Sequence, residues 1–367
     1  MSTDTRSEAD LRWMRRAIEH ARRGLGRTTP NPVVGACVVS TEGVVVGQGA
    51  HERAGEAHAE VHALDEAGAA ARGATLYCTL EPCVHLGRTG PCTDRIIAAG
   101  IRRVVAAMED PFPQVSGRGF AVLRARGIDV DVGLCADEAA RLNQPFLTTV
   151  REGRPFVIAK AATSLDGCIA AGAGQRTPLT SAPALRHAQY QRAIVDAIGV
   201  GSGTVLVDDP LLTPREVFRE RPLIRVVFDR RFRVPPDARL LGTRPDGPVI
   251  ILTTHQAMQA DPARVAALER AGATVVGTSG DIREALTALV AHDVQSLLVE
   301  GGAAVHAALW DADVVDYVQV YVAPVWLGAA GVPMFGGRGI ASAALLEQRV
   351  ELLGPDVLIE GYVHRPH

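Results

Sequence analysis

The chain has 367 residues, 47% of them hydrophobic, and this composition predicts a compact protein with two or three domains. Its 38 basic and 41 acidic residues give a formal net charge of −3, which excludes a general electrostatic attraction to nucleic acid or to acidic membranes. The six cysteines are scattered, and the sequence shows neither a signal peptide nor an apolar run of about 20 residues, so we expect a cytoplasmic protein without disulfides or membrane spans.

The first half of the chain alternates between helical and strand-like patterns. An amphipathic segment at residues 10–25 predicts a helix, and two β-branched runs within 28–49, joined by Ser-Thr-Glu-Gly, predict a hairpin. Helices are then expected at 58–71, 92–100, 117–126 and 136–150, and strands at 74–80, 101–108 and 127–134. This alternation is typical of an α/β sheet with helices on its faces.

A second pattern begins after the polar segment REGRP at residues 151–155. Strands are expected near 156–163, 195–200, 223–229, 248–253, 273–277 and 296–299, with helices between them and a strand-rich tail. We therefore expect two different α/β domains, 1–150 and 151–367.

Four residues of the first domain have the types and the order of a zinc site with a nearby carboxylate. His58 and Glu60 stand at the start of a helical pattern, and Cys83 and Cys92 follow a strand-like run. One imidazole and two thiolates leave the fourth zinc position open for a water molecule, whose pKa the metal lowers toward neutrality. Residues two apart on a helix point about 200° apart, so His58 must precede the first turn for the side chains to converge. Pro91 likewise predicts a helix N-terminus at Cys92.

Other interpretations of these four residues stay open at this point. The cysteines could be ordinary half-buried thiols with His58 as a helix cap, or the zinc could be purely structural, with a fourth protein ligand. The order His-x-Glu followed by Pro-Cys is also the signature of zinc-dependent nucleobase deaminases, in which a non-ligating glutamate moves protons. In this chain eight residues, VHLGRTGP, separate the two cysteines instead of two.

Several motifs together resemble the bifunctional deaminase/reductase family of riboflavin biosynthesis. These motifs are HAE at 58–60, TLEPCVHLGRTGPC at 79–92, TTPNPVVGA at 28–36 and TSLDG at 163–167. The resemblance covers nearly the whole chain, and the long interval between the cysteines distinguishes the family from cytidine and tRNA deaminases. It implies a cytidine-deaminase-like three-layer αβα domain at the N-terminus and a dihydrofolate-reductase-like α/β domain at the C-terminus.

For the first domain the resemblance implies both the metal site and the substrate contacts. The zinc ligands map onto His58, Cys83 and Cys92, with one Zn²⁺ per chain, and the proton shuttle maps onto Glu60. Substrate contacts map onto Asn31, His51, His85, Arg88 and Asp110. An arginine at 88 suits a phosphate because its planar guanidinium can bind two oxygens. Phe112 stands where the family commonly has an asparagine, and His51 could instead be a solvated loop histidine.

In the second domain the best local motif is SLLVEGGAAVHAALW at 296–310, a strand, a glycine turn and a helix. Such a turn lets backbone amides approach a phosphate at the helix N-terminus, although a plain tight turn has the same pattern. Arg230 and Arg231 follow a predicted strand and could hold the 2′-phosphate of NADP or be a solvated pair. Lys160, the only lysine, could contact the substrate or nicotinamide, or extend along its strand to solvent.

The resemblance implies NADPH as the cofactor of the second domain. Substrate contacts map onto Lys160, Arg192, Leu212, Arg215 and Glu300. The aromatic residue that packs on the cofactor in the family is replaced at 176–180, where Pro178 is its nearest stand-in. The implied cofactor contacts are Ala162, Pro178, Thr204, Asp208, Arg230, Gly302, Ala303, Ala304, Val305, His306, Ala307 and Ala308.

The sequence thus predicts an enzyme that acts on a small nucleotide in two steps. It would hydrolyse the exocyclic amine of 2,5-diamino-6-ribosylamino-4(3H)-pyrimidinone 5′-phosphate, with Glu60 moving the protons. It would then reduce the ribosyl group with NADPH to give 5-amino-6-ribitylamino-uracil 5′-phosphate. We expect a homo-oligomer formed through the reductase domain. The alternatives are a cytidine or tRNA deaminase with an unrelated C-terminal module, and a zinc-stabilised binding protein without turnover.

Overall fold

The computed structural model describes residues 7–84, 90–243, 246–338 and 342–367. Its residues form two compact units, Met1–Glu152 with His367, and Gly153–Pro366. Within the described ranges no helix combines the length and the apolar character that crossing a membrane requires.

The first unit is a three-layer arrangement around a five-stranded sheet in the order β2-β1-β3-β4-β5. The strands β1 and β2 form an antiparallel hairpin, β1 also pairs antiparallel with β3, and β3, β4 and β5 run parallel. The strands are β1 (Gly35–Val39), β2 (Val45–Ala50), β3 (Thr75–Cys78), β4 (Arg103–Ala106) and β5 (Asp129–Val132). The helices are α1 (Glu8–Ala21), α2 (Ala59–Ala67), α3 (Cys92–Ala99), α4 (Arg118–Ala125), α5 (Ala136–Leu142) and α6 (Gln144–Glu152), with short 3₁₀ turns at Arg22–Gly24 and Gly68–Ala71.

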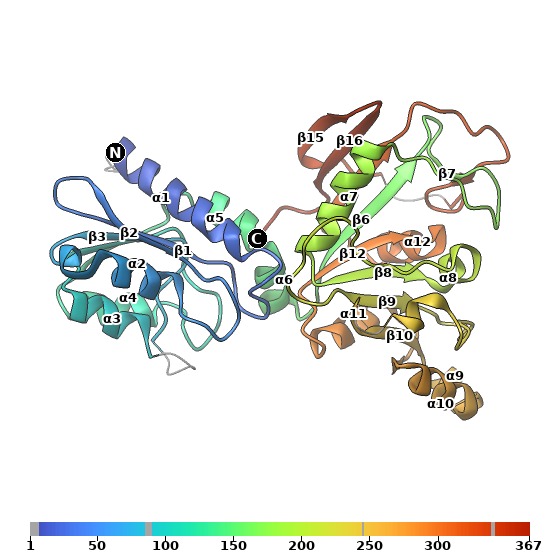
Figure 1. Cartoon of the computed structure of the whole chain (residues 1–367), viewed down its shortest axis with the longest axis horizontal. Helices are drawn as coiled ribbons and strands as arrows, with labels where there is room; N and C mark the ends of the chain where they lie inside the picture. The colour runs from blue at the N-terminus through green and yellow to red at the C-terminus, as the bar shows by residue number, and fades with distance from the viewer. Residues whose placement is uncertain (1–6, 85–89, 244–245, 339–341) are drawn as a thin grey trace. The chain divides into compact units, whose positions relative to one another are not determined.

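Side chains alternate across each strand, and the central strand β1 is buried on both faces. On β1, Ala36 and Val38 enter the core shared with α2, α3 and α4, whereas Cys37 and Val39 enter the core shared with α1 and α5. Figure 1 shows these two sets of helices on opposite sides of the sheet. The strand therefore reads as a continuous apolar run instead of an alternating one.

The prediction of one helix in this unit is wrong. The sequence suggested a single helix over 136–150, but the chain forms α5 and α6 with a break at Asn143. The Asn143 side chain bonds the backbone of Val33, accepting from its N–H at 2.9 Å and donating to its carbonyl at 2.9 Å. A side chain committed to a distant backbone favours a break, and Pro145 in the next turn adds a second reason. The other helices and strands expected in this half are confirmed.

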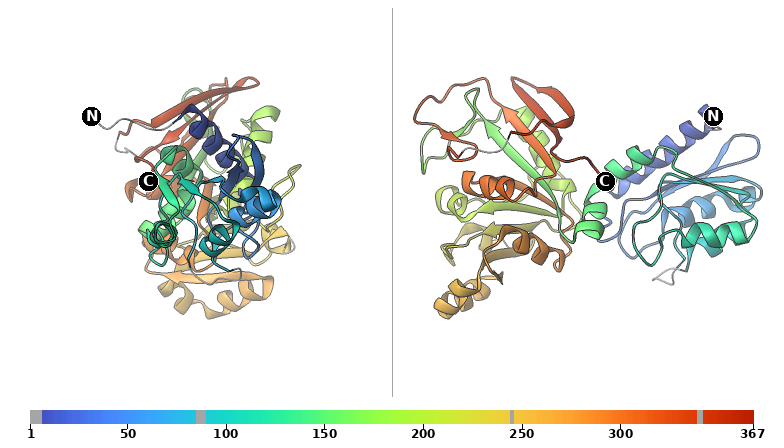
Figure 2. Two further views of the ribbon diagram at one scale, coloured as in Figure 1. Left: turned by 90° about the vertical axis from the view of Figure 1, so that its left-hand side faces the viewer. Right: turned by 180° about the vertical axis from the view of Figure 1, so that it is seen from behind.

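The second unit is built on a nine-stranded sheet in the order β11-β10-β9-β8-β12-β6-β13-β16-β15. It is parallel from β11 to β13, and the last two strands run antiparallel to their neighbours. Helices lie on both faces of the sheet, as the views in Figure 2 show. The strands are β6 (Phe156–Thr163), β8 (Ala197–Gly201), β9 (Ile224–Phe228), β10 (Val249–Thr254), β11 (Ala273–Thr278), β12 (Ser296–Gly301), β13 (Tyr317–Val322), β15 (Leu346–Leu353) and β16 (Asp356–Tyr362).

The expected strands of this half are confirmed, and the structure adds a pair that the sequence did not indicate. These two short strands, β7 (Cys168–Ala170) and β14 (Val332–Pro333), pair with each other outside the main sheet. The helices are α7 (Ala182–Ile194), α8 (Ser202–Asp208), α9 (His255–Ala260), α10 (Pro262–Ala271), α11 (Ile282–Val290) and α12 (Ala303–Asp311), with a 3₁₀ turn at Arg239–Gly242.

Candidate active sites

The predicted metal ligands of the first unit come together. His58 is the residue before α2 and has an extended backbone (φ −74°, ψ 162°), and α3 begins at Cys92. The Nδ1 atom of His58 lies 3.2 Å from Sγ of Cys92 and 3.5 Å from Sγ of Cys83. The helices α2 and α3 therefore start at the positions that the spacing of His58, Glu60 and Cys92 in the sequence predicted.

This group fits a zinc ion. Ordinary tetrahedral bonds from zinc to nitrogen and sulfur would separate those ligand atoms by about 3.6 Å. The three ligand atoms lie within 4.8 Å of one another, and the group contains no fourth His, Cys, Asp or Glu from the part of the chain that is described. Hydrogen bonds from Cys92 and His58 lower the pKa of the Cys83 thiol, which prepares one sulfur as a thiolate. An open position is typical of a catalytic site.

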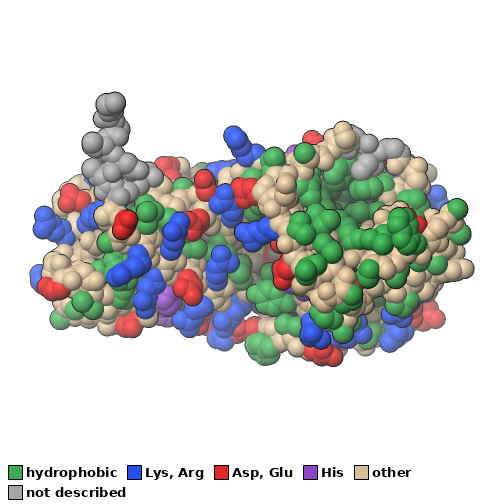
Figure 3. Space-filling view, turned by 90° about the horizontal axis from the view of Figure 1, so that it is seen from above, with side chains coloured by type: hydrophobic (Ala, Val, Ile, Leu, Met, Phe, Trp, Pro, Cys, Tyr) green, Lys and Arg blue, Asp and Glu red, His purple; other side chains and the backbone are tan. Residues whose placement is uncertain are grey.

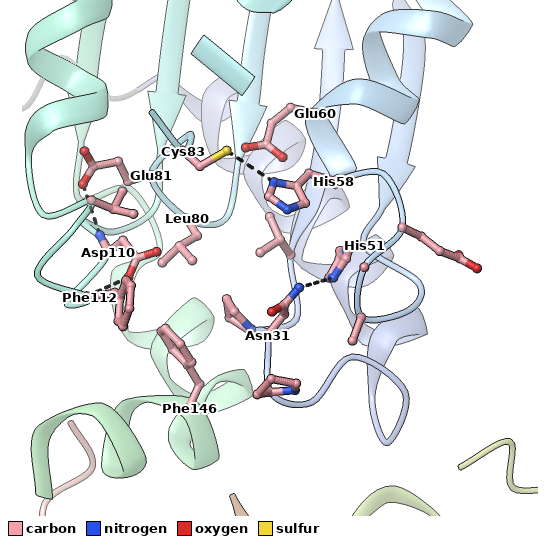
Figure 4. Close-up of a pocket in the computed structure, with 17 residues that line it drawn as sticks. Asn31, His51, His58, Glu60, Leu80, Glu81, Cys83, Asp110, Phe112 and Phe146 are labelled. Atoms are coloured by element: carbon pink, nitrogen blue, oxygen red, sulfur yellow. Dashed lines mark hydrogen bonds between the residues drawn. The ribbon is translucent and has the colours of Figure 1, made fainter. Parts of the chain in front are cut away.

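Glu60 lies in the first turn of α2 beside the ligand group, as Figure 4 shows. Its side chain is buried, and Oε2 has no hydrogen-bond partner among the described residues. Burial raises the pKa of Glu60 to about 7, although the charge of nearby His58 opposes this effect. A carboxyl group with a pKa near neutrality can both accept and release a proton.

A cavity of about 520 Å³ opens in front of these residues. On one wall the Asn31 amide lies 3.0 Å from Nε2 of His51, whose Nδ1 lies 3.1 Å from the carbonyl oxygen of Ala57. Because that carbonyl can only accept, Nδ1 carries the proton and Nε2 accepts from Asn31. Burial lowers the pKa of His51, in keeping with a neutral ring. The interpretation of His51 as a solvated loop residue is therefore wrong, since its side chain is buried against the cavity.

The opposite wall combines the carboxyl groups of Asp110 and Glu81 with apolar side chains. Asp110 is buried, and its Oδ1 accepts a hydrogen bond of 2.8 Å from the backbone N–H of Phe112. Phe112, Leu80 and Phe146 line the same cavity, and Figure 4 shows them across from Asn31 and His51. Sequence reasoning did not find Leu80, although it belongs to the TLEPC motif at 79–83, or Phe146, because α6 reaches the cavity only through the tertiary fold. The predicted contacts His85 and Arg88 lie outside the described residues.

The second unit contains a groove of about 800 Å³ lined by the ends of β8, β9 and β10 and by residues of the helices α8 and α12. Gly302 precedes α12 with a positive φ of 87°, which lets the backbone turn sharply into the helix. Arg231 and Arg233 also line the groove. The predicted cofactor residues among its lining are Thr204, Asp208, Arg230, Gly302, Ala303, Ala304, Val305 and Ala308.

Four other predicted cofactor residues are not part of the groove's lining. Ala162 is on β6, and Pro178 is in the segment before α7, three residues after Gln175, which does line the groove. His306 and Ala307 are on α12, but their side chains are buried, with 1% and 0% exposure. Burial lowers the pKa of His306 to about 4, so this imidazole is neutral.

The predicted substrate residues of the second unit converge on Glu300, at the end of β12. Arg192 donates two hydrogen bonds to its carboxylate, of 2.7 and 2.6 Å, and Nζ of Lys160 lies 3.8 Å from Oε2. Burial alone would raise the pKa of Glu300, but Lys160 and Arg192 outweigh it and lower this pKa to about 2. The side chain of Lys160 is only 12% exposed, so the interpretation that it extends to solvent is wrong.

Two further predicted substrate residues lie on the loop after α8. Leu212 is buried and has a positive φ of 57°, and the carbonyl oxygen of the next residue, Thr213, accepts a 2.9 Å hydrogen bond from Arg192. The backbone N–H of Arg215 donates to the side chain of Gln189 at 2.8 Å. The loop is thus tied to α7 at two points, and one of them is the arginine that holds Glu300.

Two family models match the chain. The cytidine and deoxycytidylate deaminase zinc-binding region matches residues 7–108, and the RibD C-terminal domain matches residues 155–359. Among curated proteins, riboflavin biosynthesis protein RibD of Aquifex aeolicus is 40% identical over 96% of this chain and 98% of its own length. The protein of the same name from Escherichia coli is 40% identical over 95% of this chain and 98% of its own.

Solved structures give the same result for the fold. RibD of Acinetobacter baumannii, form 1, superposes with a TM-score of 0.86, with 35% identity over 98% of this chain and 99% of that one. A diaminohydroxyphosphoribosylaminopyrimidine deaminase/5-amino-6-(5-phosphoribosylamino)uracil reductase of Thermotoga maritima superposes with a TM-score of 0.84, with 34% identity over 96% and 98% of the two chains.

Proposed function

The chain belongs to the RibD family and is a bifunctional deaminase and reductase of riboflavin biosynthesis, and from this premise we propose which residues carry out each reaction. The nucleotide named for the Thermotoga maritima relative is the proposed substrate. Its diaminopyrimidine would be deaminated in the cavity of the first unit. Its ribosyl group would then be reduced with NADPH in the second unit.

The proposed deamination uses the buried carboxylate beside the metal ligands. His58, Cys83 and Cys92 would hold one Zn²⁺, which supplies an activated water molecule by lowering its pKa. Glu60 would accept one proton from the attacking water and pass it to the ring nitrogen. It would then move the remaining proton of the new hydroxyl group to the exocyclic amine, which leaves as ammonia when the carbon–nitrogen bond breaks and the carbonyl group forms. The observation that carries this assignment is the unpaired Oε2 of Glu60 beside the ligand group, on a side chain that lines the cavity.

The remaining cavity residues would recognise the nucleotide. Asn31, fixed by His51, and Asp110 on the opposite wall can bind the polar edge of the pyrimidine or the ribose. Phe112 replaces a polar family residue on that wall and would contact the ring or the sugar through its apolar face. His85 and Arg88 are proposed to contact the phosphate.

The proposed reductase site combines the groove with the polar cluster at Glu300. NADPH supplies the hydride, and the protein holds C4 of the nicotinamide against C1′ of the opened sugar. Lys160, Arg192 and Glu300 would bind the nucleotide, with Leu212 and Arg215 on the adjoining loop. Thr204, Asp208 and the turn at Gly302 would contact the cofactor. Arg230 and Arg231, which line the groove after β9, would bind the 2′-phosphate that distinguishes NADPH from NADH.

Replacing Glu60 tests the deaminase assignment. With the diaminopyrimidine nucleotide as substrate, we expect Glu60→Gln to retain about one zinc per chain and to lose ammonia release by a factor of roughly 100 or more. NADPH oxidation with the deaminated nucleotide should continue. The matched control is Glu66→Gln, an exposed glutamate on the same helix. Normal ammonia release by Glu60→Gln would contradict the assignment, and release from cytidine instead would favour the rival deaminase class.

Cofactor kinetics test the reductase assignment. The double variant Arg230→Ala and Arg231→Ala should raise KM for NADPH by roughly tenfold or more, because a phosphate loses charge-assisted hydrogen bonds. KM for NADH should stay unchanged and serves as the internal control. Equal effects on both cofactors would show that the two arginines do not read the 2′-phosphate.

We also propose that the chain forms a homo-oligomer through its second unit. The strand β15 is an edge strand, and its Val350 and Leu352 are 67% and 76% exposed. Figure 3, seen from the side on which β15 and α7 lie, shows hydrophobic side chains gathered over this unit. An exposed apolar edge strand is suited to pairing with a second copy.

A further inference from the structure

Glu81 has a set of contacts that the proposed chemistry does not use. The side chain is 3% exposed, and its carboxylate accepts hydrogen bonds from four backbone N–H groups of a single segment. Oε2 accepts from Asp110 at 3.3 Å and from Gly117 at 2.9 Å. Oε1 accepts from Gly119 at 2.7 Å and from Phe120 at 3.4 Å. One carboxylate therefore ties both ends of the segment 110–120 to the residue that follows Leu80.

Part of this arrangement is a helix cap supplied from outside the helix. Gly117 is the residue before α4, and the first N–H groups of a helix have no partner within it. A carboxylate at this end satisfies these donors and interacts favourably with the helix dipole. The start of α4 packs closely against the turn that contains Glu81. A Cβ on Gly119 would lie 2.2 Å from the carbonyl oxygen of Pro82 and 2.9 Å from Oε1 of Glu81. Glycine at 119 allows α4 to approach this turn.

The segment that Glu81 holds forms one wall of the deaminase cavity. Asp110, Phe112 and Val115 line the cavity. Glu81 bonds the backbone of Asp110 itself, and Phe112 and Val115 lie between that point and Gly117. On the other side of the same turn, Cys83 belongs to the metal-ligand group. Figure 4 shows the carboxylate of Glu81 turned toward the Asp110 segment and away from His58. Glu81 thus lies between the metal ligands and the wall that faces the substrate.

We propose that Glu81 is a positioning residue for substrate recognition, which sets the distance between the metal group and the Asp110–Val115 wall. It acts through the backbone of that segment, since both of its oxygens are engaged by N–H donors. The inference rests on the proposed deaminase function and adds a residue to it. A wall displaced by a fraction of an ångström weakens the hold on the nucleotide while the ligand group stays intact.

The main test is Glu81→Gln in the full-length, zinc-loaded enzyme. Glutamine keeps the shape, but its amide group places a donor against backbone donors, so part of the segment loses its acceptor. We expect KM of deamination for the diaminopyrimidine nucleotide to rise by roughly tenfold or more, with kcat changed by less than about threefold. Zinc content and reductase activity should match those of the wild type. The control is Glu109→Gln, whose carboxylate accepts a 2.9 Å hydrogen bond from the hydroxyl of Ser116, with both KM and kcat expected to stay unchanged.

A second variant approaches the same contact from the helix. Gly119→Ala would push α4 away from Glu81 without altering any residue of the metal turn, so KM should rise again with zinc content unchanged. This variant decides the question if Glu81→Gln does not fold. An unchanged KM in either variant, measured on folded and zinc-loaded protein, would overturn the proposal. So would a Glu81→Gln variant that loses zinc while its zinc-loaded fraction keeps the KM of the wild type. Ammonia release by the wild type tests the deaminase function itself. A failure of that function can therefore be distinguished from a failure of the role proposed for Glu81.

Discussion

Glu300 shows how the charge of a buried residue depends on its neighbours. The ordinary effect of burial is to raise the pKa of a carboxyl group and to favour its neutral form. Around Glu300, however, Lys160, Arg192 and Arg215 favour the anion, and its pKa falls to about 2. The sequence placed Glu300, Lys160 and Arg192 on separate segments. Only the tertiary structure brings them together: Lys160 reaches Glu300 because β6 pairs with β12, and Arg192 reaches it from α7.

Glu300→Gln should destabilise the second unit in a pH-dependent way. The folded pKa of about 2 lies below the ordinary value of 4.5, so the ionised group contributes stability above pH 4.5 and loses it as the pH falls toward 2. At pH 7 the variant should lose on the order of 3–5 kcal/mol, because two buried cations lose their partner. The difference in melting temperature from the wild type should narrow below pH 4.5. Melting curves that stay equally far apart at pH 7 and pH 3.5 would contradict this account.

At the scale of elements, the first site depends on where helices begin and end. His58 and Glu60 lie near each other because α2 starts between them, and Cys92 belongs to the same group because α3 starts there. These starts were predicted from the sequence. His58 and Glu60 are two residues apart and cannot converge within one regular helix, and Pro91 indicates a helix start at Cys92. The break between α5 and α6 was not predicted, although Pro145 is a local signal for it, because its other cause is a contact between Asn143 and Val33, two residues 110 positions apart.

The contact between Asn143 and Val33 should contribute to the free energy of unfolding and to the position of the nearby Asn31. In Asn143→Ala the buried N–H and carbonyl of Val33 each lose a partner, so we expect a loss of about 1–3 kcal/mol in the free energy of unfolding. Val33 is two residues from Asn31, so KM of deamination should also rise. Chemical denaturation and deaminase kinetics measure the two effects. Asn143→Asp, which keeps the acceptor and loses the donor, should fall between wild type and Asn143→Ala, and an alanine variant as stable as the wild type would refute the role.

At the scale of the whole molecule, each compact unit contains one of the two candidate sites in full. The residues of the metal group and its cavity belong to Met1–Glu152, and those of the groove and the Glu300 cluster belong to Gly153–Pro366. Loss of zinc should therefore stop ammonia release and leave NADPH oxidation with the deaminated nucleotide unaffected. The feature of the second unit that points beyond the single chain is the exposed edge strand β15.

Charges on β15 should dissociate the proposed oligomer. Val350 and Leu352 are two apart on one strand and so lie on the same face, and the double variant Val350→Lys and Leu352→Lys would place two ammonium groups there. Light scattering should show a lower mass than for the wild type, with the fold retained. The control is Val132→Lys, a half-exposed residue on β5, which is an edge strand of the five-stranded sheet. A wild type that is already a monomer, or a variant of unchanged mass, would contradict the prediction.

The sequence by itself determined the metal-ligand group, the residue proposed as proton carrier and most of the strands. Each of these depends on local spacing: His58 and Glu60 at a helix start, Cys92 after Pro91, and apolar runs of strand length. Only the tertiary structure decided which distant side chains complete the sites. Phe146 reaches the cavity from α6, Glu81 binds the segment 110–120, and Lys160 meets Glu300 across neighbouring strands. Such contacts produce no periodic pattern of residues in the sequence, because they depend on how helices and strands pack together and not on how each one forms.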